Sequence, residues 1–342
     1  MRRPTIRDLA TAAGVSIATV NRVIGGSGAV RQSTMRRVHD AAEATGFDGL
    51  GAIKSRVSAV QDHYDFGFLL HQPTRPWYQN VARALKQAAE DRQDCQIKPR
   101  IEFLDDLAPQ TIAERMLALG QTCGVVAVVS AVHPVVSQAV KTLQQHGVSV
   151  VALISPLSAT AELPFVGLDN WKVGRTSAWA FAHICKAPGK LGILVGNHRY
   201  QCQEMNESGF RSYFRECAPG FTLLEPLSTF ESRAIAQDMT EKLLHDHPDI
   251  VGLYVSGGGI TGAVTALSTS DRAGQITVVG YELMDVTRQA LVDGILTLVI
   301  SHPLARLAEE TIAVMIRAVA SQAESANLIS ILPFDIYTRE NI

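Results

Sequence analysis

Residues 5–24 have the sequence TIRDLATAAGVSIATVNRVI, which predicts two short helices joined by a tight turn. Thr5 can cap the start of the first helix, and Asp8 stands three residues later, where an acid completes a capping box. Gly14 supplies the positive φ that ends a helix sharply, and Ser16 can cap a second helix two residues on. Two helices joined by a short turn that contains glycine form a helix-turn-helix.

The second predicted helix has an apolar face and a polar face. Val20, Val23 and Ile24 share one side at helical spacing, so we expect them to pack inward. The other side carries short or polar side chains that can enter a DNA major groove: Ile17, Ala18, Asn21 and Arg22. In that groove an arginine can bond guanine in bidentate fashion, an asparagine can contact adenine or phosphate, and apolar side chains can contact thymine methyl groups. The alternative is a three-helix bundle whose solvated basic face binds protein.

A third helix is expected over residues 32–45, closed by Gly46.

The distribution of charge supports a nucleic-acid partner for the N-terminal end alone. Residues 1–56 carry nine Lys or Arg and four Asp or Glu, a balance of +5, although the chain as a whole has a formal charge of −2. The remaining residues carry 22 basic and 29 acidic side chains, a balance of −7. A basic module on an acidic body indicates a polyanion that binds one end.

The whole run from Thr5 to Ile24 resembles the headpiece of the lactose repressor (LacI) family of transcription regulators. The resemblance implies base contacts from Ile17, Ala18 and Arg22. It implies phosphate contacts from polar side chains near the turn and the third helix: Ser16, Thr19, Asn21 and Thr34. Thr5 is a further candidate for DNA contact. A regulator of this kind would be a homodimer, a repressor that binds a near-palindromic double-stranded operator.

The linker after the headpiece departs from the family pattern. Members carry a segment like Pro-Asn-x-x-Ala-Arg-x-Leu, which folds into a hinge helix on DNA and wedges a leucine into the minor groove. Residues 48–57 here are DGLGAIKSRV, without the Pro and Asn and with two glycines that weaken a helix. The residues of this segment that can still contact DNA are basic or apolar: Lys54 and Arg56 for phosphates, Ile53 or Val57 as a wedge.

The rest of the chain alternates apolar strands with amphipathic helices, which predicts doubly wound α/β units. The expected strands are residues 66–70, 100–104, 125–129, 148–154, 165–168, 191–195, 250–255, 277–281, 296–300 and a last strand within 328–337. Helices are expected between most of them, including residues 78–91, 134–146, 171–186, 203–217 and 304–321. Runs such as VVAVV favour strands buried on both faces, as in parallel sheets.

The body resembles a periplasmic sugar-binding protein of two Rossmann-like lobes, and this resemblance sets the predicted domains. Residues 1–47 would form the headpiece, residues 48–63 the linker, and residues 64–342 an effector-binding and dimerisation domain. Within it, the first lobe would comprise about 64–167 and 302–325, and the second about 168–301 and 326–342. The fold class is therefore α/β with an N-terminal helix-turn-helix.

The same resemblance implies an effector site in the cleft between the lobes, where strands end. Its predicted residues follow strand ends or begin helices: Arg75, Trp77, Tyr78, Ser130, Ser155, Asp169, Asn206, Ser256, Gly257, Glu282 and His302. The two aromatic rings can stack on a sugar or polyol. Each group also has an alternative role: Trp77 and Tyr78 in the core, Asp169 and His302 as helix caps, Asn206 as an exposed helix residue. The chain lacks the family's arginine near Asn206, so the effector need not be a common aldose.

An enzyme remains the competing interpretation. Residues 257–262, GGGITG, satisfy GxGxxG after a strand and before a helix, and Glu282 follows twenty residues after Gly262. That is the pattern of a dinucleotide-binding site, so an NAD-dependent oxidoreductase is the alternative function. No catalytic set accompanies the motif, and the same glycines suit a turn that binds effector hydroxyls. An interaction scaffold with a degenerate headpiece is a third possibility. We expect no cofactor and no enzymatic activity.

Composition places the chain in the cytoplasm. No apolar run approaches the ~18–20 residues of a membrane helix, and the N-terminus has no apolar signal region. The five cysteines are odd in number and form no CxxC, which favours reduced thiols. We expect no membrane partner and no metal site.

Overall fold

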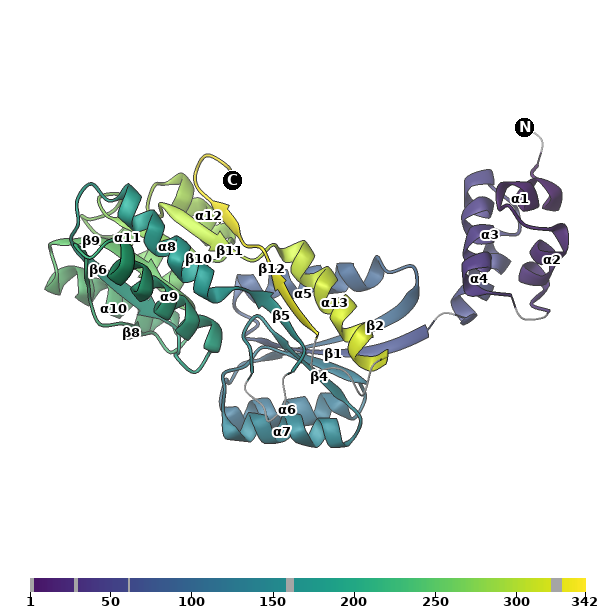
Figure 1. Cartoon of the computed structure of the whole chain (residues 1–342), viewed down its shortest axis with the longest axis horizontal. Coiled ribbons are helices and arrows are strands. Elements are labelled where there is room, and N and C mark those ends of the chain that lie inside the picture. The colour runs from purple at the N-terminus through teal and green to yellow at the C-terminus, as the bar shows by residue number, and fades with distance from the viewer. Residues whose placement is uncertain (1–2, 28–29, 61, 158–162, 321–327) are drawn as a thin grey trace. The chain divides into compact units, whose positions relative to one another are not determined.

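The computed structural model describes residues 3–27, 30–60, 62–157, 163–320 and 328–342. The chain divides into two compact units, Met1–Tyr64 with Ala89–Lys98, and Asp65–Ala88 with Pro99–Ile342. The first is a small group of helices, and the second is built on two sheets (Figure 1). Within the described residues, no helix combines the length and the apolar character needed to cross a bilayer.

The headpiece forms as its capping signals predict. Helix α1 spans Ile6–Ala12, and the capping box between Thr5 and Asp8 is present. Helix α2 spans Ile17–Gly25 with the side chain of Ser16 as its cap, and α3 spans Gln32–Thr45, ending at the left-handed Gly46. Apolar side chains from these helices and from residue 53 beyond them meet in one core: Leu9, Ala10, Ala13, Val20, Val23, Met35, Val38, Ala41, Ala42 and Ile53.

The presence of Ile53 in that core corrects the sequence analysis of the linker. Residues Leu50–Val60 form a regular helix, α4, which packs against α2 and α3. Ile53 is fully buried between them. It therefore cannot act as a minor-groove wedge in this structure, because its side chain is enclosed in the headpiece core. The first compact unit thus continues past residue 47 and includes this helix. The side chain of Val57, the other candidate wedge, lies outside the described residues.

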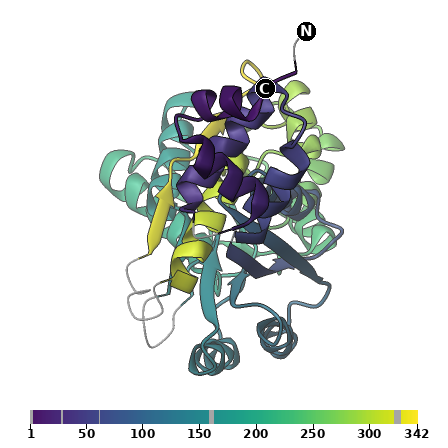
Figure 2. The same ribbon diagram turned by 90° about the vertical axis from the view of Figure 1, so that its right-hand side faces the viewer.

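The first lobe is a six-stranded sheet in the order β12-β5-β4-β3-β1-β2. Its strands are β1 (Asp62–His71), β2 (Cys95–Leu104), β3 (Val125–Val128), β4 (Ser149–Leu153), β5 (Phe165–Leu168) and β12 (Ile329–Leu332). Its helices are α5 (Pro76–Glu90), α6 (Pro109–Gly120), α7 (Pro134–Gln145) and α13 (Leu304–Ala320). Helices α6 and α7 lie side by side on one face, as Figure 2 shows end-on, and α13 packs on the other.

The second lobe is a seven-stranded sheet. Six strands follow the order β13-β11-β10-β9-β6-β7, and the seventh, β8, also pairs with β6. Its strands are β6 (Lys190–Val195), β7 (Thr222–Leu223), β8 (Leu227–Ser228), β9 (Ile250–Val255), β10 (Thr277–Tyr281), β11 (Leu298–Ser301) and β13 (Asp335–Tyr337). Its helices are α8 (Asn170–Ile184), α9 (Gln201–Cys217), α10 (Arg233–Asp246), α11 (Ile260–Ser268) and α12 (Asp285–Val292). Helix α8 packs against α9 and β10, and α10 packs against α11.

The chain passes between the lobes after β5, after β11 and after β12. The last of these passages corrects the predicted lobe boundary. Residues 329–332 pair in parallel with β5 of the first lobe, whereas residues 335–337 pair with β11 of the second. The sequence predicted one strand within 328–337, all of it in the second lobe. Pro333 separates the two strands, because proline has no amide hydrogen for a continuous ladder.

Candidate functional site

The predicted DNA-contacting residues of α2 lie on one exposed face. Ile17 is 41% exposed although it is apolar, and Ala18, Asn21 and Arg22 are also exposed. Ser16 and Thr19 stand at the start of the same helix, where the Ser16 Oγ accepts a hydrogen bond from the Thr19 amide at 3.2 Å. The arrangement leaves an apolar patch and a guanidinium available to a major groove.

The other predicted DNA contacts surround this face less directly. Thr5 caps α1 through Asp8, with an Oγ1–Oδ2 distance of 2.7 Å, and Thr34 is half-buried at the start of α3. Lys54 and Arg56 are exposed on α4. The Arg56 guanidinium packs against Gly26, where a Cβ atom would overlap it, so it is held near the end of α2.

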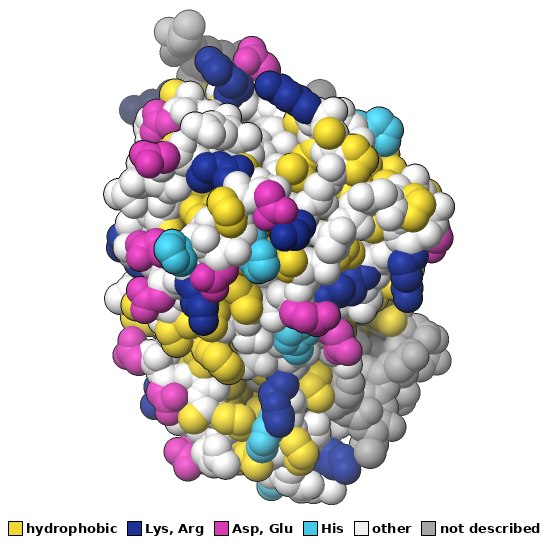
Figure 3. Space-filling view, turned by 90° about the vertical axis from the view of Figure 1, so that its left-hand side faces the viewer, with side chains coloured by type: hydrophobic (Ala, Val, Ile, Leu, Met, Phe, Trp, Pro, Cys, Tyr) yellow, Lys and Arg dark blue, Asp and Glu magenta, His cyan; other side chains and the backbone are white. Residues whose placement is uncertain are grey.

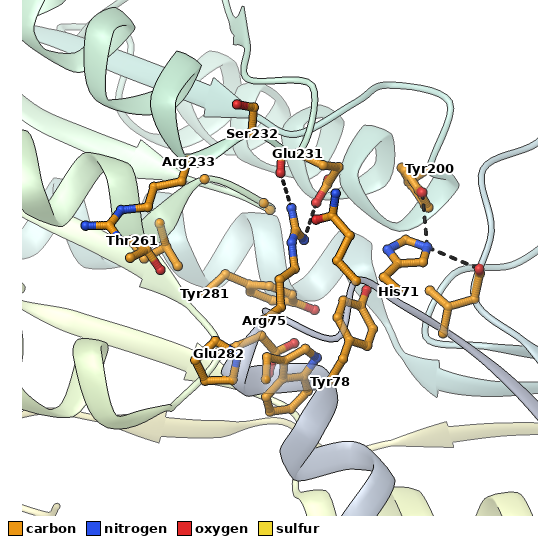
Figure 4. A pocket seen from close by; sticks show the side chains of 18 of the residues that line it. His71, Arg75, Tyr78, Tyr200, Glu231, Ser232, Arg233, Thr261, Tyr281 and Glu282 are labelled. Atoms are coloured by element: carbon orange, nitrogen blue, oxygen red, sulfur yellow. Dashed lines mark hydrogen bonds and ion pairs between the residues drawn. The ribbon is translucent and has the colours of Figure 1, made fainter. Parts of the chain in front are cut away.

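A cavity of about 610 Å³ lies between the two lobes (Figure 4). The first lobe contributes residues that follow β1, β2, β3 and β4, including His71, Arg75, Trp77, Tyr78, Asp105 and Ser155. The second lobe contributes residues around the starts of α9, α10 and α11 and the end of β10, including Tyr200, Gln203, Glu231, Arg233, Gly257 and Glu282. The wall is therefore built where strands end and helices begin, which is where α/β folds bind ligands.

Backbone strain is concentrated at this cavity. In the described part of the chain, four non-glycine residues have positive φ: Ile154, Phe230, Glu231 and Glu282. All four line the cavity. Such conformations persist only where the surrounding structure imposes them, and they cluster at ligand sites.

The structure brings six of the predicted effector residues to the cavity wall: Arg75, Trp77, Tyr78, Ser155, Gly257 and Glu282. The other five are not among the residues that line the cavity. Ser130 is buried and donates to the carbonyl of Ala131, and Asp169 caps α8 through the Lys172 amide. Asn206 is fully buried rather than exposed and donates to the carbonyl of Ser256, itself buried.

His302 lies behind the cavity wall and not in it. Its Nδ1 is 2.6 Å from the Glu282 Oε1, and Ser301 Oγ and the His302 amide donate to the other carboxylate oxygen at 3.0 and 3.1 Å. The indole of Trp77 packs on the imidazole with ring centroids 5.9 Å apart. Both oxygens of the Glu282 carboxylate thus already have partners in Ser301 and His302. The side chain therefore lines the cavity without being a free hydrogen-bond acceptor for an effector.

The centre of the cavity is an ion pair between the lobes. Arg75 Nη1 donates to the Glu231 Oε2 at 2.6 Å, and Arg75 Nη2 donates to the Glu231 carbonyl. Gln203 Nε2 donates to the other carboxylate oxygen of Glu231 at 2.7 Å. Burial alone would raise the pKa of Glu231, but the Arg75 charge and the Gln203 hydrogen bond hold this pKa below its ordinary value. The carboxylate is therefore ionised although it is buried.

A buried histidine forms a second contact between the lobes. His71 Nε2 is 3.1 Å from the Tyr200 hydroxyl and 3.1 Å from the carbonyl of Val129. Burial lowers the pKa of His71 to about 4. The positive charge of Arg75 also lowers this pKa, whereas the negative charge of Glu231 raises it. Tyr78 packs against the same imidazole at a centroid distance of 4.9 Å. The imidazole is neutral at pH 7.

Four residues of this site were not predicted from the sequence: His71, Tyr200, Gln203 and Glu231. His71 ends an apolar strand, and a polar residue at that point was the one signal available for it. Glu231 and Tyr200 stand in loops without a motif, and only the packing of one lobe on the other brings them to Arg75 and His71.

The glycine motif forms the predicted turn between β9 and α11, with Gly259 at φ 105° as the helix cap. However, the Glu231 carboxylate packs against Gly258, where a Cβ atom would overlap it. A dinucleotide phosphate at this turn would meet a negative charge. The turn thus gives the oxidoreductase alternative no support. Among the described residues, no group of three His, Cys, Asp or Glu side chains is placed to hold a metal ion.

Comparisons with known proteins agree with both units of the structure. Residues 66–323 match the periplasmic binding protein domain family, and residues 5–48 match the bacterial regulatory proteins of the lacI family. This chain belongs to the periplasmic binding protein domain family and carries a lacI-family headpiece. Both parts of the predicted family and fold class are confirmed.

Individual relatives divide between regulators and binding proteins. The HTH-type transcriptional regulator GalR of Escherichia coli is 24% identical over 291 residues, which are 83% of this chain and 81% of GalR. The D-ribose/D-allose-binding protein of Pseudomonas aeruginosa is 29% identical over 133 residues, 39% of this chain and 41% of that protein. The lacI-family chain thus matches less than half the length of this second relative.

Among solved structures, the glucose-galactose binding protein GanP of Geobacillus stearothermophilus has a TM-score of 0.72 at 15% identity, over 82% of this chain and 99% of GanP. This likeness concerns the fold of the body.

Proposed function

We propose that this lacI-family protein binds a near-palindromic operator as a homodimer and represses transcription. A small polyhydroxylated effector, a sugar or polyol, would bind between the lobes and control DNA binding. The regulator would act in the cytoplasm, together with its operator. The observation that carries it is the combination of an exposed reading face on α2 with a cavity shared by two lobes on one chain.

The cavity suits a small polar ligand. Its volume of about 610 Å³ is within the ~300–1,000 Å³ usual for small-molecule sites. Aromatic side chains from both lobes supply apolar surfaces, and Arg75, Gln203 and Ser155 supply hydrogen-bonding groups. The ribose/allose-binding and glucose-galactose binding proteins to which the body is similar support a sugar as the class of ligand.

An effector that contacts both lobes changes the free energy of one lobe arrangement relative to another. The shift in operator affinity can be no larger than the effector's own difference in affinity between the two arrangements, typically ~1–3 kcal/mol. In a dimer, movement of the lobes would alter the spacing of the two headpieces on successive major grooves. Repression and its relief would follow from that spacing.

The test is selection of bound duplexes from a random DNA library at near-physiological salt. We expect recovery of a palindrome with two half-sites, which then becomes the assay for a panel of sugars and polyols. Recovery of nothing, or only of binding that is insensitive to sequence and lost with salt, would overturn the proposal.

A further inference from the structure

The Glu231 carboxylate occupies a position in the cavity that is built to hold an anion. It accepts from the Arg75 guanidinium and from the Gln203 amide, at 2.6 and 2.7 Å. It also packs against the turn at the start of α11, whose backbone amides favour negative charge. Figure 4 shows Arg75 directed at this carboxylate from the opposite lobe. Arginine and a helix start are the usual partners of a phosphate or carboxylate ligand.

The surrounding backbone is shaped to keep this carboxylate in place. Phe230 and Glu231 both have positive φ, 52° and 61°, so the loop before α10 is held in a conformation that side chains rarely adopt. A Cβ atom on Gly196 or Gly258 would overlap the carboxylate oxygens. Two glycines therefore leave room for this side chain, and the strained loop directs it inward.

The remaining charges of the cavity do not restore a positive field. Asp105 and Glu282 also line the wall, together with one further cation among the lining residues, Arg233, whose Nη2 is 3.5 Å from the hydroxyl of Thr265, which does not line the cavity. On the face of the second lobe that Figure 3 shows, Lys or Arg and Asp or Glu side chains are interspersed, so that surface does not present a field of one sign. The interior pair sets the electrostatic preference.

We propose that Glu231 is a specificity-determining residue: it fills the cavity's anion site with the protein's own carboxylate, so that the effector is an uncharged polyhydroxyl compound. Sugar phosphates and sugar acids are excluded, because their anionic group would meet the carboxylate instead of a free Arg75. This inference rests on the proposed function, since it concerns the ligand class of the same cavity.

The test uses inorganic phosphate as the probe, with calorimetric titration of the full chain at constant ionic strength. We expect phosphate to bind Glu231→Ala saturably and at least about tenfold more tightly than the wild type, whose binding should lie at or below the detection limit, because like charges at a site weaken binding by at least that factor. The double variant R75Q/E231A should lose the gain. Glu225→Gln is the matched control: it removes the same charge from a side chain that is 94% exposed.

Wild-type binding of phosphate comparable to that of Glu231→Ala would overturn the inference. So would no gain in Glu231→Ala, or a gain that survives in R75Q/E231A. If Glu231→Ala does not fold, Glu231→Ser removes the carboxylate, leaves a small polar side chain that vacates the site, and should show the same gain. A second arm compares D-ribose with D-ribose 5-phosphate and D-galactose with D-galacturonate. Tighter wild-type binding of either anion than of its parent sugar would also refute exclusion.

The outcome is separable from that of the proposed function. Operator selection reports on the headpiece and involves no phosphate ligand. If Glu231→Ala gains phosphate binding but no operator is recovered, Glu231 still determines ligand specificity, in a protein with another function. If an operator is recovered but Glu231→Ala gains no phosphate binding, the regulatory function stands and the role of Glu231 is refuted.

Discussion

Arg22 is the exposed cation on the reading face of α2, and it gives the sharpest test at the scale of one residue. Replacing it with alanine should weaken operator binding by ~1–3 kcal/mol and relax specificity at one base pair in each half-site, because a bidentate guanine contact would be lost. Titration of single-base operator variants measures both effects. Arg37→Ala, an exposed arginine on α3, is the control. An equal loss on every DNA sequence would instead assign Arg22 to a phosphate.

His71 gives a prediction for stability against pH. Its pKa is about 4 in the folded protein and ordinarily 6.5, so the unfolded chain takes up a proton first as the pH falls. Its contribution to folding is complete above pH 6.5 and is lost as the pH falls towards 4. At pH 5 the loss is about 2 kcal/mol. Denaturant unfolding of His71→Gln at pH 7.5 and 5 should show a pH dependence weaker by about that amount.

The control for His71 is His245→Gln, which removes an exposed histidine from α10. The change in pH dependence that it causes is the baseline against which the effect of His71→Gln is compared. If the unfolding free energies of the wild type and of His71→Gln change equally with pH, protonation of other groups accounts for the acid sensitivity of the body.

Which site residues the sequence could predict follows from how far apart their partners lie in the chain. Arg75, Trp77 and Tyr78 stand in the turn after the first body strand, where the family resemblance predicted effector contacts, and all three line the cavity. Glu231 is 156 residues from Arg75 and has no motif around it. Its role depends on the packing of one lobe against the other, which no local pattern specifies.

At the scale of elements, α4 forms although Gly51 lies in its first turn and Gly49 directly precedes it. A Cβ atom on Gly51 would meet no other atom within 4 Å, whereas a Cβ atom on Gly49 would overlap the ring of Phe47. Gly51→Ala should therefore stabilise α4 by about 0.5–1 kcal/mol, and Gly49→Ala should not, because Phe47 must move. Hydrogen exchange of the α4 amides in the full chain measures the difference. Equal protection in the two variants would show that burial of Ile53 alone determines the helix.

The same scale shows why most of the predicted strands agree to within two residues while others do not. Strands β1 and β2 begin at Asp62 and Cys95, before the predicted residues 66 and 100, β7 and β8 were not predicted, and the last predicted strand is two strands. Strands β3, β5, β9 and β10 are apolar runs buried on both faces, and burial of that kind leaves a continuous signal. Strands β12 and β13 alternate exposed and half-buried residues over a few positions on either side of Pro333. A short edge strand of that kind carries little periodicity, so its sheet is set by packing.

At the scale of the whole molecule, the basic headpiece on an acidic body makes operator binding depend on salt. This salt dependence can show how many headpieces bind one operator. Lys54 is exposed on α4 of the basic headpiece, whereas the body is acidic. Each phosphate contact contributes about −0.9 to the slope of log K against log salt. If two chains bind one operator, Lys54→Ala removes two contacts, so the slope should become shallower by about 1.8 and affinity should fall uniformly across sequences.

Lys242→Ala, on α10 of the body, is the matched control and should leave the slope unchanged. A change of about 0.9 would mean that one headpiece supplies the lysine contact, which a symmetric dimer on a palindrome does not allow. An unchanged slope would remove Lys54 from the DNA interface and leave α4 with its packing role around Ile53.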